Sequence, residues 1–261
     1  MILMIVFGVL MGTLGVFYEI VARRNVKNVN LRDKVCYVTG GSSGLGLALA
    51  KELFKNGATI TIVSRRVSEL EKAVSEIEIC RVNETQKVFY VSADCTNYQE
   101  TLSAIEESKT KTGEYPEYVF TCAGASYPGF FIDQDVSIFE KNMQLNYFGT
   151  LYTIHECAKK MVENNVKGKL VLVGSTLSMM SFAGFSQYSP TKYAVRGLAD
   201  TLRNELKAYG ISVHLYLPGT ILSPGLESEV RTGYLIFFEN TTFLQKTWFV
   251  YLIEPHETEN H

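Results

Sequence analysis

The sequence has little of what marks several classes of protein. It has no C-x-x-C pair and no excess of Lys and Arg, since 25 basic residues face 27 acidic ones. Binding to nucleic-acid phosphates normally needs a surplus of positive charge on one face, so we expect no nucleic-acid partner. With 46% apolar and 20% charged residues, the composition also excludes a disordered chain, a collagen and a coiled coil.

Cysteine usage excludes a disulfide framework and a structural metal site. The cysteines are odd in number, and most lie in apolar runs: Cys36, Cys80, Cys95, Cys122 and Cys157. We therefore expect reduced thiols, as in a chain that faces the cytosol. His155 and Cys157 are the only close His/Cys pair, and two ligands do not make a zinc site, so no metal is expected.

Only one apolar run is long enough to cross a membrane, and it is at the amino terminus. Residues 1–22 are apolar except for Glu19, and Arg23, Arg24 and Lys27 follow. A helix needs about 20 apolar residues to span a bilayer, and basic residues after it keep the next domain in the cytoplasm. We predict a transmembrane anchor at 1–22 and a basic juxtamembrane linker at 23–30. A cleaved signal peptide or a buried N-terminal helix are the alternatives.

From residue 31 the chain alternates short β-rich runs with longer stretches of helical spacing. This alternation predicts an α/β fold with a Rossmann-type, doubly wound parallel sheet, and no repeat or linker divides residues 31–230. The expected strands are Val35–Thr39, Thr59–Ser64, Lys87–Ser92, Tyr118–Cys122, Lys169–Gly174 and Ser212–Leu217. The expected helices include Leu45–Asn56, Glu69–Ile79 and Asp135–Asn164. Ligands of such sheets bind where the strands end.

The turn after the first expected strand is rich in glycine. It reads Thr39-Gly40-Gly41-Ser42-Ser43-Gly44-Leu45-Gly46. Glycines allow a tight turn and let backbone N–H groups approach a pyrophosphate at the start of the next helix. We therefore expect a dinucleotide here, with the contacts drawn from Gly40, Ser42, Ser43, Gly44 and Gly46.

The end of the second strand indicates which dinucleotide is bound. Arg65 and Arg66 stand where an acidic residue would favour NAD, and guanidinium groups pair well with a 2′-phosphate. NADPH is therefore the expected cofactor, although two solvated arginines at a helix start are the plain alternative. Asp94, after the third strand, either reaches the adenine amino group or caps the helix that starts near Tyr98.

Three residues after the fifth strand suggest proton-transfer chemistry. Ser175 ends that strand, and Tyr188 and Lys192 follow four residues apart, on one face of a helix. A nearby ammonium lowers the pKa of a phenol toward the working range of an acid–base catalyst. Because proline is tolerated only in a first helical turn, Pro190 places the helix start near Ser186–Gln187.

Taken together, these motifs resemble the short-chain dehydrogenase/reductase family over about residues 31–225. The motif set is Thr39–Gly46, Asn146, Ser175, Tyr188, Lys192 and Pro218-Gly219. The resemblance implies that Tyr188 exchanges the proton, that Ser175 polarises a substrate carbonyl, and that Lys192 also holds the nicotinamide ribose. It further implies that Asn146 supports a water that relays protons to Lys192, a role that the residues alone do not indicate.

The same resemblance supplies the remaining cofactor contacts. The family's N-N-A-G appears here as Thr121–Gly124, which keeps the backbone approach of Ala123 and Gly124 but loses the asparagine side chains. Pro218 and Gly219 follow the last strand. Ser223 stands where the family often has a threonine that contacts the nicotinamide amide.

Some stretches resemble a particular group in the family, membrane-bound reductases that use NADPH in sphingolipid synthesis at the cytosolic face of the endoplasmic reticulum. These are Cys122–Ala125, Tyr188–Ala199 and Pro218–Gly225. The resemblance implies a long-chain 2-amino-3-ketone lipid as substrate, a membrane partner, and leaves a homodimer open. A reductase of steroids or of acylated dihydroxyacetone phosphate is the second enzymatic reading. A weakly active, truncated cofactor-binding protein is the third, because residues 231–261 form a short, aromatic-rich, divergent tail.

Overall fold

The computed structural model describes residues 31–221. Four predictions therefore lie outside the described residues: the anchor at 1–22, the linker at 23–30, the contact from Ser223 and the tail at 231–261. Among the helices of residues 31–221, none combines the length and the apolar character needed to cross a bilayer.

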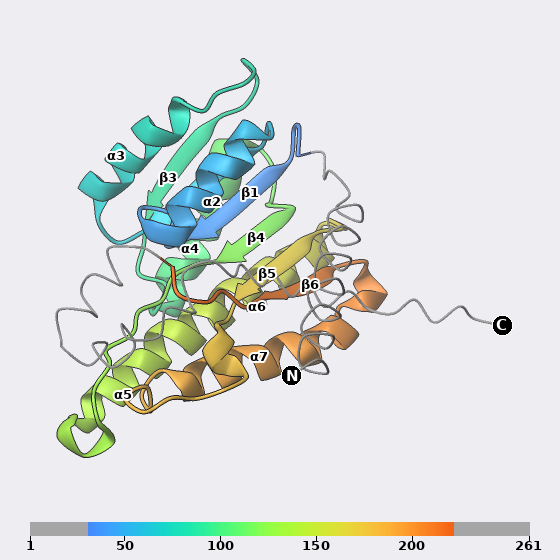
Figure 1. Ribbon diagram of the computed structural model, residues 1–261. Helices are drawn as coiled ribbons and strands as arrows, with labels where there is room; N and C mark the ends of the chain where they lie inside the picture. The colour runs from blue at the N-terminus through green and yellow to red at the C-terminus, as the bar shows by residue number, and fades with distance from the viewer. Residues whose placement is uncertain (1–30, 222–261) are drawn as a thin grey trace, which may run out of the picture. The chain divides into compact units, whose positions relative to one another are not determined.

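Six parallel strands form one sheet in the order β3-β2-β1-β4-β5-β6 (Figure 1). Their bounds are β1 Val35–Thr39, β2 Thr59–Ser64, β3 Val88–Ser92, β4 Tyr118–Thr121, β5 Lys169–Val173 and β6 Ser212–Tyr216. The strand order reverses direction between β1 and β4, which is the switch point of a doubly wound sheet. The predicted Rossmann-type parallel sheet is confirmed, and all six expected strands form with ends that move by at most one residue.

Helices lie on both faces of the sheet (Figure 1). Helices α2 and α3 pack on each other and on β1–β3, whereas α4, α6 and α7 cover the opposite face. Within residues 31–221 the helices are α2 Gly44–Lys55, α3 Val67–Glu78, α4 Tyr98–Thr112, α5 Val136–Met143, α6 Gly149–Glu163 and α7 Ser189–Glu205. The short helical turns are η1 Phe131–Asp133, η2 Gln144–Phe148, η3 Thr176–Ser178 and η4 Lys207–Tyr209.

The main core lies between the sheet and helices α4, α6 and α7. Strand β1 is buried at every position, as expected for a strand covered on both faces. From the helices, Ile154, Met161 and Val195 pack into the same cluster, each at most 1% exposed. Full burial of such a side chain contributes about 1.5–3 kcal/mol, so this packing holds α6 and α7 on the sheet.

The stretch predicted as one helix over Asp135–Asn164 is helical along most of its length, but it is not regular. Helix α5 passes into the π-helical segment η2 and then into α6. A π-helical turn inserts one extra residue, and such turns are frequent at functional sites. This one carries Asn146, which is fully buried.

The start of α7 differs from the prediction. The helix begins at Ser189, with Tyr188 as its N-cap, and not near Ser186–Gln187. Pro190 has no N–H to donate to the carbonyl of Ser186, so the regular ladder cannot begin before it. The preceding residues form separate turns, in which Tyr188 N donates to Phe185 O at 3.0 Å. Tyr188 therefore lies at the junction between a loop and a helix.

Candidate active site

The glycine-rich turn is packed too closely for any larger residue. Gly40 has a φ of +66°, and a Cβ atom there would lie 2.8 Å from the backbone nitrogen of Ala123. A Cβ on Gly46 would lie 2.3 Å from the carbonyl oxygen of Gly40. Gly44 also has a positive φ, of 52°. Three of the predicted glycines thus have a conformational or steric reason to be glycine.

The first turn of α2 is suited to an anion. Ser43 is the N-cap but makes no capping hydrogen bond with its side chain, and the first turn contains no acidic residue. The N-terminal amides of a helix and its dipole favour phosphate. Ser42 donates its hydroxyl to Ser64 Oγ at 3.0 Å, which ties the turn to the end of β2. Together with the tight turn, these residues fit the pyrophosphate of a dinucleotide.

Two exposed arginines follow β2, as predicted. The Nη1 atom of Arg65 lies 3.7 Å from Asp94 Oδ2, and Arg66 is the N-cap of α3. Asp94 Oδ1 accepts hydrogen bonds from the backbone and the hydroxyl of Thr96, at 2.9 and 2.8 Å. The side chain that caps α4 is Asn97. Of the two alternatives for Asp94, helix capping is therefore wrong, and contact with adenine stays a prediction.

Ser175 is held by a small hydrogen-bonded turn at the end of β5. Its Oγ accepts from Leu177 N at 3.1 Å, and its own N–H donates to Ser178 Oγ at 3.1 Å. A serine hydroxyl has one proton to donate and two lone pairs. Because the bond to Leu177 uses only a lone pair, the hydroxyl proton can be donated to a carbonyl oxygen. The side chain is nearly buried, at 8% exposed.

Lys192 lies beneath Tyr188 and against the end of β5. Its Nζ is 5.6 Å from the centroid of the Tyr188 ring and donates to Val173 O at 3.0 Å. The side chain is only 4% exposed, and this burial lowers the pKa of Lys192 from 10.5 to about 8. Because Val173 is two residues before Ser175, this bond brings the three predicted catalytic residues to one edge of the sheet.

Asn146 connects the loop after β4 to α7. Its Oδ1 accepts from Ala125 N at 2.9 Å, and its Nδ2 donates to Ala125 O at the same distance. The Nδ2 group also lies 3.1 Å from Asn142 Oδ1 and 3.2 Å from Thr191 Oγ1. Thr191 in turn donates to Tyr188 O at 2.7 Å. The amide thus helps to fix the backbone that carries Tyr188.

The segment that departs from the family pattern still reaches the site. Ala123 N donates to Thr39 Oγ1 at 3.3 Å, and a Cβ on Gly124 would lie 3.0 Å from Asn146 Oδ1 and 3.6 Å from Lys192 Nζ. Cys122 is close enough for the Lys192 ammonium to act on its charge, but burial dominates and raises the pKa of the thiol to about 12. All five cysteines are free.

The end of β6 contributes backbone to the same edge. Thr176 N donates to Pro218 O at 3.0 Å, which fastens the segment after β6 to η3 and so to Ser175. Gly219 is exposed, and a Cβ there would have no atom of the described residues 31–221 within 4 Å. The structure thus places Pro218 against Thr176, next to Ser175, while the cofactor contacts of Pro218 and Gly219 stay predictions.

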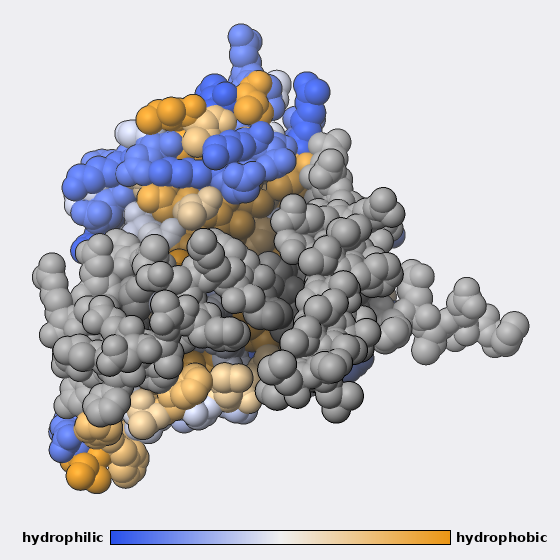
Figure 2. Space-filling model, viewed as in Figure 1, coloured by the Kyte–Doolittle hydropathy of each residue, from blue (hydrophilic) through white to orange (hydrophobic). Residues whose placement is uncertain are grey.

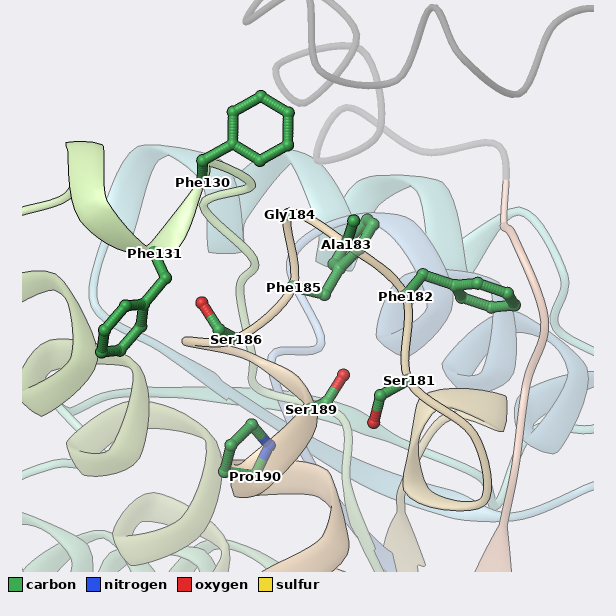
Figure 3. Close-up of a pocket in the computed structure, with 10 residues that line it drawn as sticks. All are labelled: Phe130, Phe131, Ser181, Phe182, Ala183, Gly184, Phe185, Ser186, Ser189 and Pro190. Atoms are coloured by element: carbon green, nitrogen blue, oxygen red, sulfur yellow. The ribbon is translucent and has the colours of Figure 1, made fainter.

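A cavity of about 430 Å³ lies beside the N-terminus of α7. Figure 3 shows its walls, which come from the loop after β4 and from the loop between Ser175 and Tyr188. Rings line much of it, together with small side chains: Phe130, Phe131, Ser181, Phe182, Ala183, Gly184, Phe185, Ser186, Ser189 and Pro190. Ligand sites in proteins are typically about 300–1,000 Å³, so the cavity could take part of an apolar ligand.

The profile of the family described as short chain dehydrogenase matches residues 34–233. The chain belongs to the short chain dehydrogenase family. Among its relatives is the "PIGF/3-ketodihydrosphingosine reductase fusion protein" of Schizosaccharomyces pombe, 46% identical over 194 residues, which cover 74% of this chain and 38% of that protein. The 3-ketodihydrosphingosine reductase of Mus musculus is 38% identical over 196 residues, covering 75% of this chain and 58% of that one.

Solved structures agree with this assignment. A short-chain type dehydrogenase/reductase from Mycobacterium ulcerans is 29% identical, with a TM-score of 0.72, and the match covers 79% of this chain and 76% of that one. The chain spans well under two thirds of the length of both curated relatives described above. The family of the chain is therefore shown, and its reaction and substrate are proposed below.

Some residues of this short chain dehydrogenase site could not be recognised as site residues from the sequence. Thr191, Val173 and Asn142 position the predicted residues, yet each reads as an ordinary helix or strand residue. Thr191 carries the one usable signal, because it lies between Tyr188 and Lys192. Asn146 was predicted through the family resemblance alone, and its buried side chain, with hydrogen bonds to Ala125, Asn142 and Thr191, supports a structural function for it here.

Proposed function

We propose that this short chain dehydrogenase uses NADPH to reduce the 3-keto group of 3-ketodihydrosphingosine to the alcohol of sphinganine. The observation that carries the proposal is the grouping of Ser175, Tyr188 and Lys192 at the end of β5, in a chain similar over most of its length to 3-ketodihydrosphingosine reductases. A second line of support is the apolar cavity next to that group.

The proposed reaction adds one hydride and one proton to the carbonyl group. NADPH, when bound, supplies the hydride that reaches the carbonyl carbon. Ser175 donates a hydrogen bond to the carbonyl oxygen, and Tyr188 gives its phenolic proton to that oxygen. Lys192, protonated at neutral pH because its pKa is about 8, stabilises the resulting phenolate. Asn146 and Thr191 hold the backbone of Tyr188 in position.

NADPH, and not NADH, is proposed because of the charges after β2. The 2′-phosphate of NADPH carries the extra negative charge, and Arg65 and Arg66 are exposed at the edge where the glycine turn lies. Arg65 is already near Asp94, at 3.7 Å, a separation at which an exposed ion pair contributes little. Its guanidinium can therefore turn to a phosphate at low cost.

The long alkyl chain of the proposed substrate agrees with the cavity lined by phenylalanine. Each methylene that leaves water contributes roughly 0.8 kcal/mol, so an apolar cavity beside the reacting group favours a long chain over a short one. A steroid would need a broader, rigid slot, and an acylated dihydroxyacetone phosphate would need a cation for its phosphate near the cavity. Within residues 31–221, the segment from 170 to 191 that forms one cavity wall has no charged residue.

The test of the proposed function is a turnover assay on the detergent-purified full chain. We expect reduction of 3-ketosphinganine with NADPH, far slower reduction with NADH, and loss of nearly all turnover in Tyr188→Phe. This variant keeps the ring, so NADPH binding measured by cofactor fluorescence should be unchanged. Equal turnover in Tyr188→Phe and wild type would remove Tyr188 from the mechanism, and absence of turnover in both would contradict the proposed function.

The proposal includes a location, the endoplasmic reticulum membrane with the catalytic domain in the cytosol. It is supported by the apolar residues 1–22 and the basic residues after them. Two N-x-T sequons, at Asn83 and Asn240, provide the test. We expect no glycan at either site, alkali-resistant membrane association, and release of the domain when residues 1–22 are deleted. A mass shift sensitive to endoglycosidase would contradict this orientation.

A further inference from the structure

Exposed apolar side chains are concentrated on two loops at the mouth of the candidate site. Among residues 31–221, seven of the thirteen large hydrophobic side chains that are exposed lie between β4 and α5, at the first residue of α5, or between β5 and α7. Ile132 is 89% exposed and Val136 is 70% exposed. We call this set the apolar lip, and it consists of Phe130, Phe131, Ile132, Val136, Met179, Met180 and Phe182.

The two loops of the apolar lip are joined by hydrogen bonds. Gly129 N donates to Gly184 O at 2.9 Å, and the carbonyl of Tyr127 accepts from Gln134 Nε2 at 2.6 Å and from Gln187 Nε2 at 2.5 Å. In Figure 2 the projecting loop beside α5, at the lower left, carries hydrophobic side chains at its tip. The lip is therefore held in place by one backbone hydrogen bond and two glutamine side chains, and its apolar side chains still face solvent.

The charges around the lip indicate what it contacts. Residues 118–132 and 170–191 contain no Asp, Glu, Lys or Arg. An electrostatic attraction to anionic lipid or to a nucleic acid would need Lys or Arg here. The exposed Phe, Ile and Met side chains of these two uncharged stretches match the hydrocarbon boundary of a bilayer, where charged side chains are costly. Two exposed acidic residues, Asp133 and Asp135, stand between Ile132 and Val136, and Asp135 caps α5.

The lip is also continuous with the reacting groups. The loop that carries Met179, Met180 and Phe182 connects Ser175 to Tyr188 directly. The rings of Phe130, Phe131 and Phe182 line the cavity of about 430 Å³ (Figure 3). A molecule that reaches the lip is therefore already at the wall of the cavity.

We propose that the apolar lip inserts into the surface of a bilayer, so that a lipid ketone passes from the membrane to Tyr188 without crossing water. This inference rests on the proposed function for the identity of the lipid. The lip is a second membrane contact, separate from the anchor proposed at residues 1–22. It lies on the described domain, at the entrance of its site.

A depth measurement tests the insertion without using catalysis. The only tryptophan is Trp248, so the probes are Ile132→Trp and, as the matched control, Ile79→Trp, each in a Trp248→Phe full-length chain. Ile79 is 84% exposed, close to the 89% of Ile132, but lies at the end of α3. With phosphatidylcholine vesicles brominated on the acyl chains, we expect quenching and a blue shift for the probe at 132 and neither for the probe at 79.

A kinetic measurement tests the passage of substrate. The variant Ile132→Asp/Val136→Asp is compared with the control Ile79→Asp/Val82→Asp, in which Val82 is 61% exposed. Each methylene withdrawn from hydrocarbon changes partitioning roughly fourfold, so the lip variant should reduce vesicle-embedded 3-ketosphinganine at least about tenfold more slowly. Both variants should keep the wild-type rate on a short, water-soluble 2-amino-3-ketone.

The outcomes separate this inference from the proposed function. Equal quenching at positions 132 and 79, or equal vesicle rates for the two double variants, would overturn the lip. A fluorescence change that follows protein concentration and not lipid would assign the surface to a second copy of the chain, and would overturn it as well. If wild type reduces neither ketone but the probe at 132 is still quenched, the lip holds and the proposed function fails.

Discussion

Replacing Lys192 by methionine should make the protein more stable and inactive. The pKa of Lys192 falls from 10.5 to about 8 because its side chain is buried. That difference corresponds to about 3 kcal/mol of unfavourable free energy for the buried ammonium at neutral pH. Methionine has a similar shape and no charge, but it loses the 3.0 Å bond to Val173 O, which costs about 1 kcal/mol. The net expectation for Lys192→Met at pH 7 is a gain of about 2 kcal/mol.

The pH dependence of this gain has a defined sign. The folded state of wild type binds fewer protons than the unfolded state between pH 8 and pH 10.5, so wild-type stability rises with pH across that window. The advantage of Lys192→Met should therefore be fully present below pH 8 and should shrink toward pH 10.5. For a domain of this size, about 2 kcal/mol raises the midpoint of thermal unfolding by roughly 4–8 °C.

Thermal unfolding of the full chain in detergent, without cofactor, is the measurement. Lys55→Met is the control, because that side chain is 52% exposed and its removal should shift stability by at most about 0.5 kcal/mol. A lower midpoint for Lys192→Met at pH 7 would refute the reasoning, since it would mean that the ammonium is stabilised within the fold. A gain that does not change between pH 7 and pH 10 would refute the assigned cause.

Two further predictions concern the cofactor and the buried amide. Replacing both Arg65 and Arg66 by alanine should raise the Kd for NADPH roughly 10-fold or more, because a charge-assisted bond contributes about 1.5–3 kcal/mol. The Kd for NADH should stay unchanged. Equal weakening of both cofactors in a fluorescence titration would contradict the NADPH assignment. Asn146→Ala should lower the free energy of unfolding by about 2 kcal/mol, since it leaves the half-buried N–H and C=O of Ala125 without their side-chain partner, whereas Thr191→Val should cost only about 1 kcal/mol. Chemical denaturation that ranks the two variants equally would remove Asn146 from its bridging position.

The sheet was predictable because its inner strands are largely buried, with β1 buried at every position. A strand such as β1, which is buried at every residue, needs a nearly continuous run of apolar residues. That run ends where the helices no longer pack on the strand. The start of α7 was predicted two to three residues too early, because Pro190 permits a helix but does not say which turn comes before it. Local sequence sets the type of an element, and hydrogen bonds among distant segments set its ends.

The site was predictable where chemistry requires one residue type, and less so where only a contact is needed. Gly40 and Gly46 are fixed by close approach of backbone, so the glycine pattern is informative. The function of Asp94 was ambiguous because a carboxylate there could either contact adenine or cap a helix, and the structure shows that Asn97 caps α4. The acceptor of Lys192 is a main-chain carbonyl, which any residue could supply at position 173.

Deletion of one residue from the π-helical segment Gln144–Phe148 would change the helix that contains it. A π-turn accommodates one surplus residue, so removing one residue there would leave α5 and α6 as a single regular helix. Every side chain before the cut would then rotate by about 100° relative to those after it, since a residue turns that far in an α-helix. Asn146 would leave Ala125 and Thr191, while Ile154 and Met161 would keep their packing on the sheet. The domain would gain a regular helix and lose the hydrogen-bonded bridge to Tyr188. The π-turn thus allows one helical stretch both to pack on the sheet and to place Asn146 in the site.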